Sequence, residues 1–225
     1  MKSLHKIIVM ALAVMTVIAA GIGLLQRRTY TDISRNQNPT ETMQVAMWLD
    51  EISPDHMEFL KENLPDSPII LRVKGTGKIA YHYFQNLQQA TIQEVYKGSD
   101  LSVGEDIYLA NGSRCYLFSK NQANCGFVND CQAGQDYLVF LQEKILTPQK
   151  EAYPVYTVMP YVIEPIFNYS DIQNKVVSVS LDQILVPYAE VADNEFFAGS
   201  ESGLAHWLAL KRQMLQLYPA GDKLP

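Results

Sequence analysis

The chain has little of the chemistry that metal centres and most catalytic sites require. Its 225 residues include four histidines, at positions 5, 56, 82 and 206, and three cysteines, at positions 115, 125 and 131. The histidines are scattered, and the cysteine spacings differ from the Cys-x2-Cys pairs of common metal sites. The sequence therefore predicts no metal site, no cofactor and no catalytic residue.

Positive charge is also scarce beyond the N-terminal region. Residues 29–225 hold 14 of the 18 basic side chains and all 24 acidic ones, which gives them a net charge of −10. Phosphate backbones repel such a surface, so nucleic acid is excluded as an expected partner. The hydrophobic content of 48% and the charged content of 19% are typical of an ordered protein.

One long segment lacks charge altogether. Residues 7–25 are uncharged, and as a helix they would span about 28 Å, close to the thickness of the hydrocarbon core of a bilayer. The segment is longer than the usual apolar region of a signal peptide, and Arg27 and Arg28 follow it. We expect residues 1–28 to form a signal anchor that holds a single-pass protein in the cell membrane. Cleavage of this segment, followed by secretion, is the alternative.

The charges that flank this segment are nearly balanced and do not settle its orientation. Lys2 and Lys6 precede it, and Arg27 and Arg28 follow it. The short N-terminal tail and the cluster of cysteines favour a body outside the cytoplasm. We therefore expect a polar linker over residues 29–42 and an extracytoplasmic domain over residues 43–225.

The cysteines have two interpretations. In an oxidising compartment, a disulfide between Cys115 and Cys131 would close a loop of about 15 residues and contribute about 3 kcal/mol to stability. Cys125 is the alternative partner. The competing interpretation is that all three thiols are reduced and buried as small apolar side chains.

Short runs of β-branched and aromatic residues predict a β-rich body. The expected strands are residues 69–73, 79–84, 91–97, 107–110, 137–142 and 156–163, with a weaker candidate at 176–181. The glycines of residues 75–78 predict a bulge or turn in a bent strand, because the segment does not match the phosphate-loop motif. The apolar run 137–142 is expected at the centre of the sheet, and residues 114–131 are expected to form a polar loop.

Two helices are also expected. Ser53 and Pro54 are suited to begin a helix over residues 56–64, in which His56 would be exposed. Ser200 is suited to cap an amphipathic helix over residues 203–218. Residues 43–52 fit a helix or a strand equally well, and residues 182–186 are a weak helical candidate.

Three segments carry a resemblance to a known superfamily. They are Ala-Thr-Ile-Gln-Glu-Val-Tyr-Lys-Gly at 90–98, Val-Gly-Glu-Asp-Ile at 103–107, and Gly-Gln-Asp-Tyr-Leu-Val-Phe-Leu at 134–141. They resemble the netrin and tissue-inhibitor-of-metalloproteinases (TIMP-like) superfamily, specifically its bacterial membrane-anchored members. The resemblance implies an OB-like β-barrel of five to six strands, closed or partly open, over residues 69–165. The N-terminal zinc-chelating cysteine of the metalloproteinase inhibitors is absent here, so protease inhibition rests on superfamily analogy alone.

The expected function is that of a membrane-anchored, extracytoplasmic binding or interaction module without catalytic residues. Its partner would be an unknown protein or small molecule that meets the barrel face and its loops. The alternative is a hydrolase with a carboxylate site at Glu190, Asp193 and Glu195, although a solvated loop is the simpler interpretation of these acids. Phe196 and Phe197, which follow, are expected to dock the C-terminal helix onto the barrel.

Overall fold

The computed structural model describes residues 2–29, 43–81, 86–111, 115–118, 121–146 and 152–221. The chain divides into two compact units, Met1–Asn36 and Gln37–Pro225. Most of the predicted linker, like His82, lies outside the described residues.

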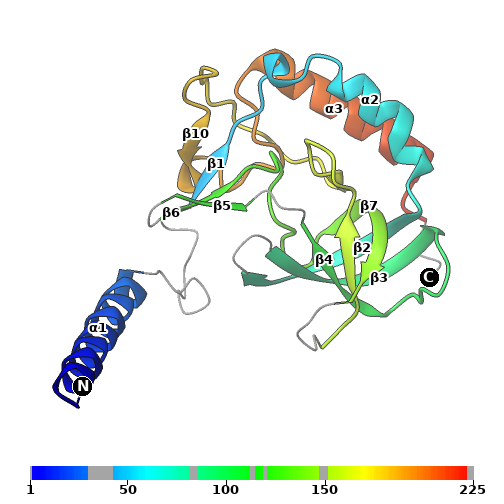
Figure 1. The fold of residues 1–225 in the computed structure, drawn as a ribbon. Coiled ribbons are helices and arrows are strands. Elements are labelled where there is room, and N and C mark those ends of the chain that lie inside the picture. Colours follow the sequence, from blue (N-terminus) through cyan, green and yellow to red (C-terminus); the bar gives the residue numbers. More distant parts are fainter. Residues whose placement is uncertain are drawn as a thin grey trace. The chain divides into compact units, whose positions relative to one another are not determined.

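The first unit contains one long apolar helix, α1 (Lys2–Thr29) (Figure 1). Within it, the 20 residues Ile8–Arg27 have a mean hydropathy of 2.6, and none of this stretch is buried in the protein. The length and composition suffice to cross a membrane. The predicted N-terminal apolar helix is confirmed, and it is compatible with both a single-pass anchor and a signal sequence.

The second unit is rich in β-structure and is built around a six-stranded sheet (Figure 1). Its strands are β2 (Ile69–Tyr81), β3 (Asn86–Lys97), β4 (Asp106–Ala110), β7 (Asp136–Ile145), β8 (Val155–Val158) and β9 (Ile166–Asn168). The order is β2-β3-β4-β8-β7-β9, and β2 also pairs with β7. The pairings therefore lead from β2 through β3, β4, β8 and β7 back to β2. All of them are antiparallel except that between β4 and β8.

Strand β2 is one bent strand, as the bulge or turn expected at residues 75–78 implies. Its register against β3 shifts between Gly75 and Ile79, and Gly77 has a positive φ of 74°. A β-carbon on Gly75 would lie 2.5 Å from the carbonyl oxygen of Gln132. Glycine is required because only a residue without a side chain permits both the backbone angle at Gly77 and the close approach at Gly75. The predicted bulge is confirmed.

Strand β7 occupies the centre of the sheet, as predicted. It pairs with β2, β8 and β9, and its residues 138–141 are fully buried. A strand buried on both faces has a continuous apolar sequence, which explains the run Leu-Val-Phe-Leu.

A second sheet corrects the expectation of a polar loop at residues 114–131. Strands β5 (Cys115–Phe118) and β6 (Asn121–Asn124) pair antiparallel, and β6 runs parallel to β1 (Gln44–Ala46), which also pairs with β10 (Leu185–Pro187). The short, polar sequence of β6 gives little strand signal, because its pairing depends on β1, far away in the chain. The strand expected at residues 176–181 and the helix expected at 182–186 are both wrong, since only a bridge from Ser180 to Gln183 forms before β10 begins.

Two helices, α2 (His56–Asn63) and α3 (Glu201–Leu217), lie side by side (Figure 1). The Ser200 hydroxyl accepts the N–H of Gly203 at 3.1 Å, which confirms the predicted cap of α3. Helix α2 begins without a side-chain cap. Short 3₁₀ turns are η3 (Asp50–Ile52), η4 (Leu64–Asp66) and η5 (Tyr188–Glu190).

His56 is buried, contrary to the expected surface position. Only 7% of the residue is exposed, and its Nε2 accepts the N–H of Ile163 at 3.3 Å. Its ring also stacks on Phe59 and lies against Trp48. The first turn of α2 faces the protein interior, so a residue at a helix N-terminus is not necessarily a surface residue.

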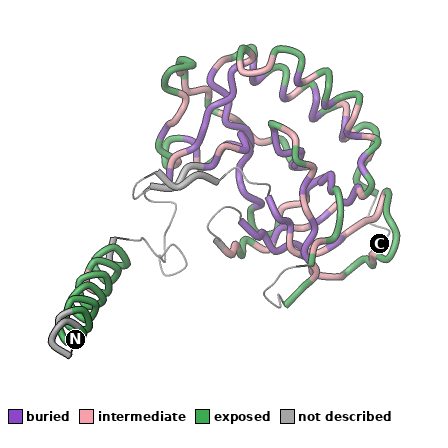
Figure 2. Tube along the Cα trace, viewed as in Figure 1, coloured by how far each residue is buried: buried purple, intermediate pink, exposed green. Residues whose placement is uncertain are grey.

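The core joins α3 to the sheet through stacked aromatic rings. Trp207 of α3 stacks on Phe196 with ring centroids 4.4 Å apart, and both also contact Phe167 of β9. Figure 2 shows exposed and buried segments alternating along α2 and α3. Phe196 therefore docks the C-terminal helix as predicted, whereas Phe197 packs in a different cluster, with Val45 and Val186.

We expect Trp207→Ala to lower the free energy of unfolding by about 3–5 kcal/mol, because it empties a fully buried ring site. Leu217→Ala, on the exposed side of the same helix, is the control and should change it by about 0.5 kcal/mol or less. Urea unfolding of the detergent-solubilised chain, followed by far-ultraviolet circular dichroism, measures both. Similar losses in the two variants would contradict this account of the core.

Candidate functional site

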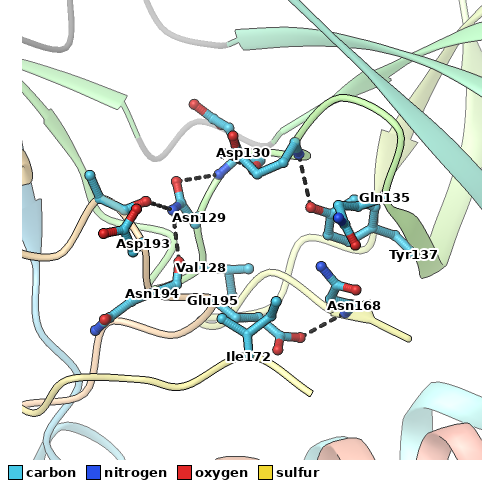
Figure 3. A pocket seen from close by; sticks show the side chains of 12 residues that line it. Val128, Asn129, Asp130, Gln135, Tyr137, Asn168, Ile172, Asp193, Asn194 and Glu195 are labelled. Carbon is cyan, nitrogen blue, oxygen red and sulfur yellow. Dashed lines mark hydrogen bonds between the residues drawn. The ribbon is translucent and has the colours of Figure 1, made fainter. Parts of the chain in front are cut away.

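A cavity of about 180 Å³ lies where three segments of the second unit meet. Residues 128–132, 168–172 and 192–195 contribute to its lining, together with Gln135 and Tyr137 at the start of β7 (Figure 3). We call this cavity the polar pocket, because most of its lining side chains are amides or carboxylates.

Backbone pairing brings two of these segments together from distant parts of the chain. Val128 forms a bridge with Phe196, and the N–H of Asn129 donates to the carbonyl of Glu195 at 2.9 Å. The third segment follows β9, in which Asn168 lies opposite Tyr137. The pocket is thus held by sheet-like backbone contacts on two sides.

Asparagine side chains fix one wall of the pocket. Asn129 donates to the carbonyls of Ala192 and Asn194, at 2.8 and 2.7 Å, and its Oδ1 accepts the N–H of Asp130 and the hydroxyl of Tyr188. Asn194 in turn donates to the carbonyls of Lys175 and Phe196. These amides are fully used within the protein, so their role is to hold the wall in place.

A buried ion pair forms the floor of this region. Glu195 is 5% exposed, and its two carboxylate oxygens accept the N–H of Asn168 at 2.7 Å and the ammonium of Lys211 at 2.5 Å. Lys211, from α3, also donates to the carbonyl of Ser170. Burial raises the pKa of Glu195, and the ammonium and the backbone N–H partly offset that effect.

The structure does not assemble the three carboxylates of the predicted hydrolase site. Glu190 and Asp193 are exposed, whereas Glu195 is buried with both oxygens bonded. The expectation of a solvated loop is wrong for Glu195, because Lys211 from the C-terminal helix neutralises it there. Nothing local in the sequence relates Lys211 to Glu195, because the two residues lie 16 positions apart on different elements.

Asp130 belongs to no motif or pattern that marks it in the sequence. It is 7% exposed, and its Oδ1 has no hydrogen-bond partner among the described residues. Burial raises the pKa of this carboxyl from 3.8 to about 6. Nearby, the Tyr137 hydroxyl accepts the N–H of Gln132 at 2.8 Å, and burial raises the pKa of this phenol, which keeps it protonated at neutral pH.

The cysteines do not form the expected bridge. Cys131 is a buried thiol whose pKa is raised by burial, and its N–H donates to the side chain of Gln88 at 2.6 Å. Cys125 is partly buried and is not disulfide-bonded. The side chain of Cys115 lies outside the described residues, but with Cys131 present as a thiol the Cys115–Cys131 disulfide is not formed. The second interpretation, a small apolar side chain in the core, describes Cys131.

Within the part of the chain that the structure describes, no cluster of three or more His, Cys, Asp or Glu side chains is placed to hold a metal ion.

No known protein-family model matches the chain, and no curated protein sequence is significantly similar to it. The resemblance to the netrin and TIMP-like superfamily therefore stays a prediction.

We expect Lys211→Met to lower the free energy of unfolding by about 3–5 kcal/mol, because it leaves the Glu195 carboxylate buried without its counter-charge. Adding Glu195→Gln to that variant should restore most of the loss. Arg212→Met, at the exposed neighbouring position, is the control. Urea unfolding of the wild type and the three variants checks this, and a double variant no more stable than Lys211→Met would contradict it.

We expect Asp130→Asn to be more stable than the wild type at pH 7.5, by up to about 3 kcal/mol, and equal to it near pH 4. The folded-state pKa lies above the unfolded value, so the native protein binds the proton more tightly and loses stability as the pH rises from about 4 to about 6. The neighbouring titratable groups Tyr188 and Cys131 have pKa values that burial raises above their ordinary values, so neither of them titrates in this window.

Unfolding titrations from pH 4 to pH 8 measure the effect, with Asp193→Asn as the exposed control. A wild type whose stability does not fall between pH 4 and pH 6 would argue against a buried ionisable Asp130.

Proposed function

We propose that the protein is a membrane-tethered binding module in which an OB-type barrel supports a ligand site at the polar pocket. The observation that carries this proposal is the pocket itself. Its walls are hydrogen-bonded internally, so the protein itself fixes the shape of a cavity of about 180 Å³. A concave, pre-formed cavity with several convergent polar groups is the usual form of a small-ligand site.

The strand pairings are an argument for the proposed barrel. Five strands, β2, β3, β4, β8 and β7, form a ring of pairings in which the last strand returns to the first. Such a ring removes the sheet edges, which is the property that defines a closed barrel. The positions of these strands also agree with the segments that resemble the TIMP-like superfamily.

Helix α1 is an argument for the proposed membrane attachment. It is apolar over the length of a bilayer, and it precedes the folded unit. We propose that the body lies outside the cytoplasm, an orientation that the reporter fusion described below tests. The cysteines no longer support this orientation, because the expected disulfide is not formed.

A hydrolase built on Glu190, Asp193 and Glu195 is not favoured. A catalytic carboxylate needs an oxygen free to exchange a proton or attack a substrate, and both oxygens of Glu195 are engaged.

The location is tested by a reporter enzyme that is active only outside the cytoplasm, fused after Pro225. We expect activity, together with retention of the full-length chain in membranes after an alkaline wash. A chain released into the medium would point to the cleaved form, and an inactive reporter on a stable chain would contradict the orientation.

Binding is tested in living cells with a photo-crosslinking amino acid at Asp193, which is exposed on the rim of the polar pocket. The same amino acid at Val103, in the exposed turn before β4, is the control. We expect specific adducts only from position 193. Equal labelling, or none at either position, would contradict a ligand site at the pocket.

A further inference from the structure

The four residues that follow helix α3 lie against strand β3 and the end of β9. We call residues 218–221 the strap. The Tyr169 hydroxyl donates to the carbonyl of Tyr218 at 2.8 Å, and the Tyr96 hydroxyl donates to the carbonyl of Pro219 at 2.5 Å. Burial raises the pKa of both phenols, which keeps them protonated as donors at neutral pH. Two adjacent carbonyls of the strap are therefore bound by side chains from two different elements.

A carboxylate binds the other end of the strap. The N–H of Gly221 donates to Oε2 of Glu94 at 3.2 Å. The same oxygen lies 3.6 Å from Nε of Arg72, the residue opposite Glu94 on β2, and this ion pair holds the carboxylate in place. Carbonyl and N–H groups occur in every peptide, so these three hydrogen bonds do not depend on the side chains of the bound segment.

The first position of the strap requires an aromatic side chain. The ring of Tyr218 lies against the rings of Tyr96 and Phe140, with centroids 5.4 and 5.8 Å apart. Phe140 is fully buried in the core of the sheet. A small side chain at position 218 would leave part of this aromatic surface open to water, which is unfavourable.

The other three positions are also restricted, except one. Pro219 has no N–H, so it leaves no backbone donor unpaired beside the sheet. Ala220 is exposed, so this position accepts any side chain. A β-carbon on Gly221 would lie 3.2 Å from Oε1 of Glu94, closer than an ordinary contact. The surface therefore fits the order aromatic residue, proline, any residue, glycine.

We propose that Glu94, Tyr96, Tyr169 and Phe140 form a peptide-binding surface for an aromatic-Pro-x-Gly segment of a partner protein, and that the strap is its autoinhibitory occupant. Residues 219–221 are exposed and belong to no helix or strand, so the strap can leave without unfolding the sheet. The attached strap has an effective concentration on the order of millimolar at this surface, so a free segment binds only when the strap is weakened.

This surface is separate from the ligand site proposed above. Glu94, Tyr96 and Tyr169 do not line the polar pocket, so each site stands or fails without the other.

The test uses the full-length chain in detergent and a fluorescent peptide with the sequence of residues 216–221, capped at both ends. Tyr218→Ala removes the ring that anchors the strap and so opens the surface. We expect fluorescence anisotropy to show saturable binding to Tyr218→Ala and at least about tenfold weaker binding to the wild type, where the attached strap competes. Gly221→Val, which disturbs only the exposed end of the strap, is a second opened variant with the same expectation.

Two further changes test the contacts themselves. Adding Tyr96→Phe to Tyr218→Ala should weaken peptide binding at least about threefold, because it removes the donor to a peptide carbonyl. Adding Tyr153→Phe, at an exposed tyrosine outside this surface, is the matched control and should leave binding unchanged. A peptide with valine in place of the glycine should also bind more weakly, because its β-carbon meets Glu94.

Near-ultraviolet circular dichroism shows which variants are folded. Equal binding by the wild type, no binding by a folded opened variant, or unaltered binding after Tyr96→Phe would overturn the proposal. A wild-type dimer that the peptide disperses, measured by light scattering, would identify a second copy of the chain as the occupant and would overturn the autoinhibited state.

Discussion

The contact between Glu195 and Lys211 is the interaction on which the architecture of the second unit depends. It joins the C-terminal helix to the segment that forms a wall of the polar pocket, and the same carboxylate also bonds to the end of β9. A buried ion pair adds little net stability compared with apolar residues of the same shape, but losing one partner is costly. The ion pair instead determines relative positions, since a single lysine fixes α3, residues 168–170 and residue 195 relative to one another. The stack of Trp207 on Phe196 next to it supplies the apolar burial that the charges do not.

The sequence was most informative where a segment's environment is uniform. The apolar run of β7, the glycines of the β2 bulge and the serine cap of α3 each carry a local signal, because a strand buried on both faces, a tight backbone approach and a helix N-terminus each restrict the residue type. Strands β5 and β6 carry no such signal. They form because β6 pairs with β1, whose Gln44 lies 79 residues before its partner Ala123, and polar residues can satisfy that backbone pairing as well as apolar ones.

The polar pocket could not have been found from the sequence for the same reason. Asn129, Asp130 and Asn194 belong to the residue types most frequent in surface loops, and the natural expectation is that they face water. What distinguishes them is burial, which follows from the pairing of residues 127–129 with residues 195–197. The acids that looked most like a site, Glu190 and Asp193, are exposed, while the buried Asp130 lies in a segment that composition assigns to a loop.

Gly75 shows how a residue without a side chain controls a site that it does not line. Its N–H and carbonyl are bonded to Gln135 and Gly134, and the carbonyl of Gln132 approaches within 2.5 Å of where a β-carbon would be. Residues 132 and 135 both line the polar pocket. The bend in β2 therefore fixes the backbone of residues 132–135, and through them the dimensions of the cavity depend on the interior of the sheet. A substitution at Gly75 would therefore alter the cavity without changing any residue that lines it.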